Sequence, residues 1–175
     1  MDYLNILTAE MSAITLTLKL SLVTCIFLFF IGTPISLYLA FKKNKIIPIF
    51  ESLVTLPLVL PPTVIGFYLL VFFNPESVLG KFFITITGEQ LAFSFSGLVF
   101  ASIFYSLPFW VQPLQNSFEK IDKKILEAGT NMGGSSLDLL LKIILPSCKR
   151  GFLTAFILSF AHTIGEFGIV LMVGG

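Results

Sequence analysis

Four long apolar stretches constrain the fold of this chain more than any other feature. They run from 12 to 41, from 46 to 73, from 91 to 114 and from 151 to 173. A helix needs about 20 apolar residues to cross the hydrocarbon core of a bilayer, and each stretch is long enough. Backbone polar groups in lipid must be satisfied within the segment, so helices are the expected form. The stretches predict an all-α, polytopic membrane protein with a single domain over residues 1–175.

The composition agrees with lipid as the surrounding solvent. Only 12% of the residues are charged and the mean hydropathy is +0.95, whereas about 25% of the residues of a soluble domain are charged. The formal net charge is +1, and no basic stripe is present that could follow a phosphate backbone. We therefore expect contact with membrane lipid and no nucleic-acid partner.

The basic residues indicate the orientation. They gather after the first stretch and between the third and fourth, namely Lys42, Lys43, Lys45, Lys120, Lys123, Lys124, Lys142, Lys149 and Arg150. Positive charge marks the cytoplasmic side of membrane proteins. This pattern predicts a multi-pass protein of the cell (inner or plasma) membrane, with its N-terminus outside and residues 116–150 in the cytosol.

The polar segment between the third and fourth stretches predicts a helix–turn–helix elbow. Asp122 can cap a first helix, and Gly133 can end it because glycine adopts the left-handed conformation at little cost. Ser135 followed by Asp138 resembles a capping box that opens a second helix, which Pro146 would end. On periodicity alone the elbow could be an amphipathic loop that merely joins two spans.

The spacing within the elbow resembles the EAA motif of ABC-importer permeases. It reads Glu127-Ala128-Gly129, three residues, Gly133, nine residues, Ile143, one residue, and then Leu145-Pro146. One position departs from the motif, because Gly129 stands where alanine is usual. Glycine still permits close approach of a partner but weakens a helix by up to about 1 kcal/mol.

Two further segments are similar to the molybdate permeases of the sulfate/molybdate/tungstate branch: "LPLVLPPTVIGFYLL" (56–70) and "GEFG" (165–168). The resemblance implies a homodimeric channel, a cytosolic ABC ATPase that docks on the elbow as a coupling helix, and an external oxyanion-binding protein. It leaves molybdate, tungstate and sulfate open as substrates. Permeases of this type continue into a final membrane helix, so the resemblance implies one span more than this sequence contains.

The same resemblance implies which elbow residues couple to the ATPase. The first arm and turn would supply Glu127, Ala128, Gly129 and Gly133, and the second arm would be held against the membrane domain by Ile143, Leu145 and Pro146. The chain has no G-x-x-x-x-G-K-[ST] phosphate loop. ATP would therefore bind the partner subunit, and we expect this chain to be a transport subunit with no cofactor and no catalytic residue of its own.

The middle of the second stretch contains three prolines within six residues, Pro57, Pro61 and Pro62. Proline removes a backbone donor and opposes a regular helix, and breaks at membrane depth are tolerated where the backbone is buried in protein or lines a watery cavity. A packed kink is the alternative. Gly66 permits close approach of another helix. These four residues are candidates for the pore or gate.

The fourth stretch places Ser159, His162 and Glu166 on one helix face, at i, i+3 and i+7. His162, Gly165, Glu166 and Gly168 are therefore further pore or gate candidates. A membrane enzyme that uses His162 and Glu166 is one alternative, since ionisable groups inside a membrane are often functional. One His and one Glu do not complete a metal site, so we expect no metal. An ATP-independent channel or secondary transporter is the other alternative.

Overall fold

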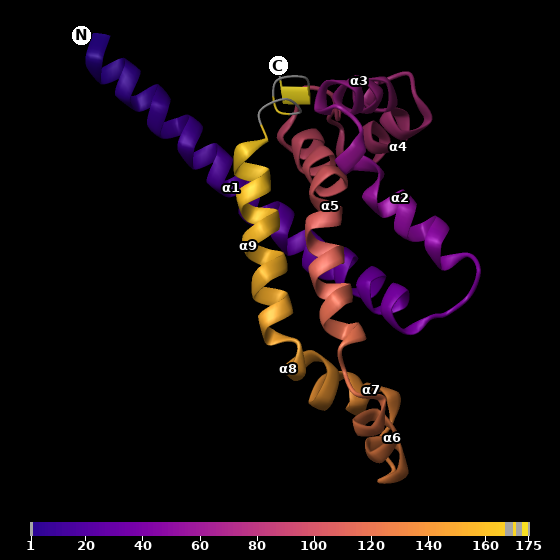
Figure 1. The fold of residues 1–175 in the computed structure, drawn as a ribbon. Helices are drawn as coiled ribbons and strands as arrows, with labels where there is room; N and C mark the ends of the chain where they lie inside the picture. The colour runs from indigo at the N-terminus through magenta and orange to yellow at the C-terminus, as the bar shows by residue number, and fades with distance from the viewer. Residues whose placement is uncertain (1, 167–169, 171–172, 175) are drawn as a thin grey trace.

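The computed structural model describes residues 2–166, 170, 173 and 174. Within these residues the chain forms helices, turns and bends but no strand, which confirms the all-α fold class (Figure 1). The side chains of the first ten residues and the backbone of 167–169, 171 and 172 are outside this description. Of the predicted pore candidates, Gly168 lies outside the described residues.

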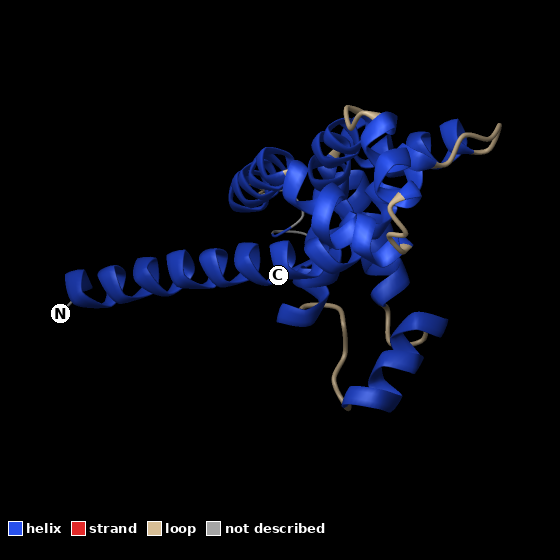
Figure 2. Ribbon diagram, turned by 90° about the horizontal axis from the view of Figure 1, so that it is seen from below, coloured by secondary structure: helices blue, strands red, loops and turns tan. Residues whose placement is uncertain are grey.

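Helix α1 (Asp2–Phe41) is the longest element. It begins well before the apolar stretch predicted from residue 12, because the polar residues ahead of that stretch continue the same helix. Its N-terminal part extends away from the other helices in both views (Figures 1 and 2). The portion Met11–Phe41 is long and apolar enough to cross a membrane.

The second apolar stretch forms two helices, α2 (Ile47–Val59) and α3 (Pro62–Phe73), bent by 109° relative to each other. Leu60, which precedes Pro61, is extended with ψ 138, as sterics before proline require. The predicted break is therefore present, at Leu60–Pro61. A short helix follows, α4 (Val78–Thr87), capped by Ser77 and ended by Gly88 at φ 76.

Helix α5 (Phe95–Glu119) is the centre of the molecule, packed against α1, α2 and α9. The bounds of this helix differ from the apolar stretch 91–114 at both ends: Ser94 caps the helix through its hydroxyl, and the helix continues to Glu119. Leu114 and Phe118 near its end are completely buried. The indole Nε1 of Trp110 donates to Thr33 Oγ1 of α1 at 3.2 Å, which joins the two helices by a buried polar contact.

Four short helices precede the last long one: α6 (Lys123–Asn131), α7 (Ser136–Leu139), the π-helix η1 (Leu140–Ile144) and α8 (Leu145–Ser147). Helix α9 (Lys149–Gly165) then runs beside α5. The predicted span of 151–173 differs from this helix at both ends, because α9 begins at Lys149 and ends at Gly165, and part of the remainder lies outside the described residues.

By length and composition, α1 and α5 can each cross a membrane. Two bent helix pairs are also apolar enough, namely α2 with α3, and residues 136–147 with α9. If each bent pair counts as one span, the described residues contain up to four spans. The four-span topology, the cytosolic loop 116–150 and the single-domain organisation of 1–175 stay predictions.

Candidate functional site

The first arm of the elbow is α6, which begins and ends with specific backbone contacts. Asp122 Oδ1 accepts a hydrogen bond from Lys124 N at 2.9 Å, as predicted for its N-cap. At the other end Gly133 N donates to Thr130 O at 2.9 Å, and Gly134 N donates to Gly129 O at 3.1 Å. This pair of bonds is a Schellman motif. Gly133 has φ +81, so the predicted glycine stop is present.

The second arm opens with the predicted capping box. Asp138 N donates to Ser135 Oγ at 3.1 Å, and Ser135 N donates to Asp138 Oδ2 at 3.2 Å. Lys142 Nζ, one turn later, donates to Asp138 Oδ1 at 2.5 Å. The hydrogen bonds from Lys142 and Ser135 lower the pKa of Asp138 to about 2.

Pro146 does not end the second arm, which corrects the prediction. The helix continues as η1 and then α8 through Pro146, and the break falls at Cys148, where the chain bends by 67° into α9. A proline ring normally collides with the carbonyl four residues earlier. The wider π-turn that precedes Pro146 relieves this contact, so the helical path survives the proline.

The two arms pack closely at Gly129. A Cβ added there would lie 2.5 Å from Leu139 Cδ2 and 3.0 Å from Ile143 Cδ1 of the second arm. Gly129 and the half-buried Ile143 therefore form the inner contact of the elbow. This contact explains why glycine is accommodated where alanine is usual in the motif.

Most of the other predicted coupling residues are exposed, and one packs against the core. Glu127, Ala128 and Gly133 are exposed on the first arm and its turn, and Pro146 is exposed on the second. Leu145 is half-buried and packs against the core. The structure therefore brings Gly129 and Ile143 together, and leaves the other first-arm residues available to a partner.

Two residues that the sequence reasoning did not single out as functional anchor the second arm. Ile144 and Cys148 are buried in one cluster with Leu28 of α1 and with Leu114 and Phe118 of α5. The i, i+4 spacing of these two residues was the available signal. These contacts hold the second arm against α1 and α5.

The sequence reasoning also missed two exposed apolar residues on the first arm. Ile125 is 52% exposed and Met132 is 89% exposed. Large apolar side chains at this exposure add apolar surface to an arm that also exposes Glu127, and exposed apolar surface of this kind is available to a protein partner. The i, i+7 spacing of Ile125 and Met132, which places them on one helix face, was visible in the sequence.

The proline-rich pore candidates lie together at the α2–α3 break. Pro57 is buried inside α2, Pro61 is exposed at the break, and Pro62 is half-buried at the first position of α3. Gly66 is buried one turn later. The break therefore has a buried side that packs and an exposed side at Pro61.

The pore candidates of α9 pack against α5. The His162 ring stacks on Tyr105 and Phe109, with centroids 4.9 and 4.0 Å apart, and its Nε2 is buried without a hydrogen-bond partner among the described residues. Thr163 Oγ1 lies 2.9 Å from Ser106 Oγ. The polar face of α9 thus lies largely in a helix–helix contact.

The end of α9 is more open. A Cβ at Gly165 would meet nothing within 4 Å, and the half-buried Glu166 follows directly after the helix. The described residues contain no group of three or more His, Cys, Asp or Glu side chains that could hold a metal ion.

Residues 32–175 match the family of binding-protein-dependent transport system inner membrane components. The chain belongs to this family. The matched range takes in the α2–α3 break, the elbow and α9, so the family assignment covers every candidate site of this permease. The family match confirms the prediction of an integral inner-membrane transport subunit.

Relatives with assigned roles are similar over most of the chain. "Molybdenum transport system permease protein ModB" of Azotobacter vinelandii is 47% identical over 166 residues, which are 95% of this chain and 74% of the relative. "Probable transport system permease protein NifC" of Clostridium pasteurianum is 32% identical over 175 residues, 99% of this chain and 59% of the relative. "Probable sulfate transport system permease protein cysT" of Chlorella vulgaris is 32% identical over 166 residues, which are 93% of this chain and 60% of the relative.

Proposed function

We propose that this permease passes molybdate, or a related tetrahedral oxyanion, from an external binding protein to the cytosol, driven by a separate ATPase. The substrate class is supported by the names of the relatives: the 47% identical one is named a molybdenum transport system permease, and a 32% identical one is named a probable sulfate transport system permease. The single observation that carries the mechanism is the elbow, with one arm exposed and the other anchored in the helical core.

The elbow would transmit motion because its two arms pack closely on each other at Gly129. The ATPase would contact Glu127, Ala128 and Gly133 on the exposed side. Gly129 couples indirectly, because it packs the first arm onto Ile143 of the second. Leu145 and Pro146 continue the second arm to the bend at Cys148. Closure of the ATPase subunits would then rotate α9 and α5, a rigid-body transition of the kind that drives switching proteins.

The α2–α3 break would form the lining of the translocation path. Pro61 and Pro62 carry no N–H, and Val64 N and Ile65 N both donate to Pro61 O, at 3.0 and 3.2 Å. Thr63 N is therefore the backbone donor of this first turn that would face an anion. Pro57 and Gly66, both buried, would hold the break against the neighbouring helices.

The end of α9 would form the gate. His162 is fixed by its aromatic neighbours on α5, and the helix ends at Gly165, with Glu166 beyond it. Gly168 would belong to the same segment. An ionised carboxylate repels an oxyanion, so Glu166 would act through hydrogen bonds and the motion of this segment, with no direct substrate contact.

The assembly would contain two copies of this chain, an ABC ATPase that binds ATP in the cytosol, and an oxyanion-binding protein outside. The chain itself would carry no cofactor. Its N-terminus would face outside, with Lys42, Lys43 and Lys45 on the cytosolic side.

Reconstitution with the candidate ATPase and binding protein tests this function. We expect ATP hydrolysis to rise several-fold when the binding protein carries molybdate and to stay basal when it is empty. Parallel samples loaded with tungstate or sulfate rank the substrates. Basal hydrolysis in every sample would contradict the proposal, and oxyanion flux through the permease without the ATPase would establish a channel or secondary transporter instead.

A further inference from the structure

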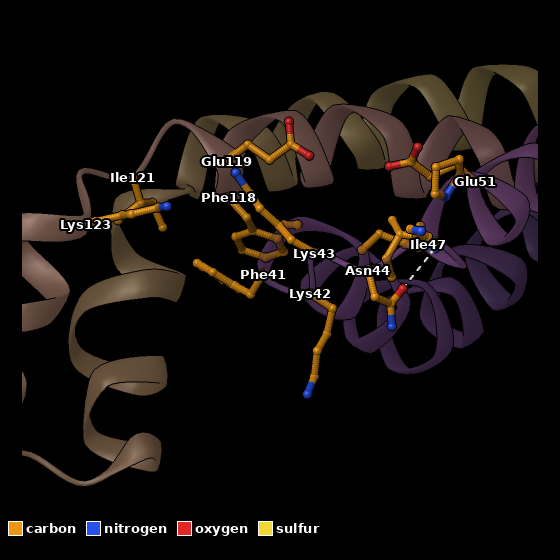
Figure 3. A pocket seen from close by; sticks show the side chains of 14 residues that line it. Phe41, Lys42, Lys43, Asn44, Ile47, Glu51, Phe118, Glu119, Ile121 and Lys123 are labelled. Carbon is orange, nitrogen blue, oxygen red and sulfur yellow. Dashed lines mark hydrogen bonds between the residues drawn. The ribbon is translucent and has the colours of Figure 1, made fainter.

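A cavity of about 760 Å³ lies where the α1–α2 turn faces the connection from α5 to α6 (Figure 3). Its lining contains the end of α1, the turn residues, the start of α2 and the residues that lead into the elbow. Ligand sites in proteins occupy about 300–1,000 Å³, so the cavity is large enough for a phosphoglycerol head group. The transport mechanism described above makes no use of it.

The charge of this cavity is mainly positive. Its lining contains four lysines and two carboxylates: Lys42, Lys43, Lys45, Lys123, Glu51 and Glu119. Both carboxylates accept from one amide, because Gln115 Nε2 donates to Glu51 Oε1 at 2.6 Å and to Glu119 Oε1 at 3.0 Å. None of the four lysines forms an ion pair with a described residue. The ammonium groups are thus available to an anion.

Two of these lysines extend toward one another across the cavity. Figure 3 shows the amino groups of Lys43 and Lys123 approaching the space beside Phe118 from opposite sides, whereas Lys42 points away. They come from segments far apart in the sequence, the α1–α2 turn and the first residue of α6. An anion between them would be held from both sides.

The cavity also has an apolar part. Phe41 is 43% exposed at the end of α1, and the half-buried Ile121 lies on the facing connection. An inorganic oxyanion gains nothing from such surface, whereas a phospholipid presents its acyl chains beside its phosphate. The cavity also lies at the ends of α1 and α5, the two helices that can each cross a membrane.

We propose that this cavity binds the phosphate group of an anionic phospholipid from the cytosolic leaflet. Lys43 and Lys123 hold the phosphate, and Phe41 and Ile121 contact the start of the acyl chains. Basic pockets between transmembrane helices on the cytoplasmic side bind anionic head groups by this chemistry. The inference rests on the orientation stated under the proposed function and adds a lipid ligand to it.

The bound lipid would connect two parts of the permease that lie far apart in the sequence. One side of the cavity is the turn between α1 and α2, and the other leads through Lys123 into the arm that carries Glu127. A phosphate held by both sides would fix the first arm of the elbow relative to the membrane domain.

Native mass spectrometry of the full-length purified chain tests the proposal. The protein is equilibrated with phosphatidylglycerol or with phosphatidylcholine in mixed micelles, and the lipid retained per chain is measured. The double variant Lys43→Gln/Lys123→Gln removes the two facing ammonium groups. The matched control Lys124→Gln/Lys149→Gln removes the same charge from exposed residues outside the lining.

We expect the unmodified chain to retain phosphatidylglycerol over phosphatidylcholine, and the double variant to lose this retention several-fold while the control keeps it. Equal loss in both variants, or no preference for phosphatidylglycerol, would overturn the proposal. Displacement of the lipid by millimolar inorganic phosphate would identify a site for free oxyanions and would also overturn it. If the double variant does not fold, the single variants are compared instead. Lys123→Gln should then lose phosphatidylglycerol retention and Lys124→Gln should keep it, and equal retention in both would overturn the proposal.

This experiment needs neither ATPase nor binding protein. Lipid retention with no stimulated ATP hydrolysis would therefore refute the transport function alone, and stimulated hydrolysis without retention would refute the lipid site alone.

Discussion

At the scale of single residues, two glycines of the elbow serve different physical needs. Gly133 has φ +81 with open space around its Cα, so backbone conformation alone requires it. Gly129 lies within the helix, and the second arm presses against it. The first need could be predicted from the sequence, because a helix stop is local. The second could not, because it depends on Leu139 and Ile143 packing back across the turn.

Replacement of Gly133 separates the conformational requirement from packing. We expect Gly133→Ala to lower the local stability of the elbow by about 1–2 kcal/mol, the cost of a left-handed conformation for a residue with a Cβ. Gly133→Asn should cost less, because asparagine tolerates this region. Hydrogen exchange at the amides of Gly133 and Gly134 measures the difference. Equal protection in the alanine and asparagine variants would contradict the conformational explanation.

Asp138 makes the second arm sensitive to acid. Its pKa is lowered from 3.8 to about 2 by bonds from Lys142 and Ser135, so the folded state favours the ionised carboxyl. The resulting stabilisation is fully present above pH 3.8 and is lost as the pH falls through about 2. Amide exchange of Leu139, whose N–H bonds Ser135 O, should follow this window. Asp138→Asn should remove the pH dependence, and an unchanged profile in that variant would show that another group is responsible.

At the scale of elements, the sequence predicted where helices break better than where they end. The α2–α3 break is imposed by Pro61 and Pro62 themselves, and the capping box by Ser135 and Asp138, so both are local. By contrast, α5 ends at Glu119, and α9 begins at Lys149 and ends at Gly165. These limits do not coincide with the ends of the apolar stretches, because packing and capping contacts set them. The passage of the helix through Pro146 depends on the preceding π-turn, which no residue pattern announces.

The prolines at 61 and 62 should control the shape of the second stretch. With a rise of 1.5 Å per residue, the 109° bend places residues 49 and 72 about 19 Å apart, whereas a straight helix would place them about 35 Å apart. Spin labels at Ile49 and Phe72, both exposed, report this distance by double electron–electron resonance. We expect Pro61→Ala/Pro62→Ala to shift the distribution toward the longer distance.

Pro48→Ala is the control for that measurement, because the exposed Pro48 lies in the first turn of α2 and not at the break. It should leave the shorter distance unchanged. A short distance retained in the double variant would mean that tertiary packing, not the prolines, imposes the bend.

At the scale of the whole molecule, the elbow is joined to the bundle by Ile144 and Cys148, and its exposed arm faces away from it. The residue motif predicted the elbow and its exposed acidic residue. The anchoring cluster and the basic cavity of Lys43 and Lys123 could not be predicted, because their members come together only when α1, α5 and the elbow are packed.

Charge reversal at Glu127 should uncouple the permease without unfolding it. Glu127 is exposed, so Glu127→Lys should leave membrane insertion and thermal stability within about 0.5 kcal/mol of the original, as is usual for surface substitutions. The binding-protein-stimulated part of ATP hydrolysis should fall at least tenfold, equivalent to about 1.4 kcal/mol of lost coupling. Lys124→Glu on the same arm is the matched control. Oxyanion uptake at the normal rate in the Glu127 variant would contradict a coupling role.

Accessibility of residue 127 tests the central claim most directly. A single cysteine replaces Glu127 in a chain whose buried Cys25 and Cys148 are changed to alanine, and a membrane-impermeant maleimide is applied to intact cells and to inverted membrane vesicles. We expect labelling only in the inverted vesicles, and protection from labelling when the ATPase is bound. Labelling in intact cells, or labelling that the ATPase does not reduce, would contradict an elbow that receives its motion from the cytosol.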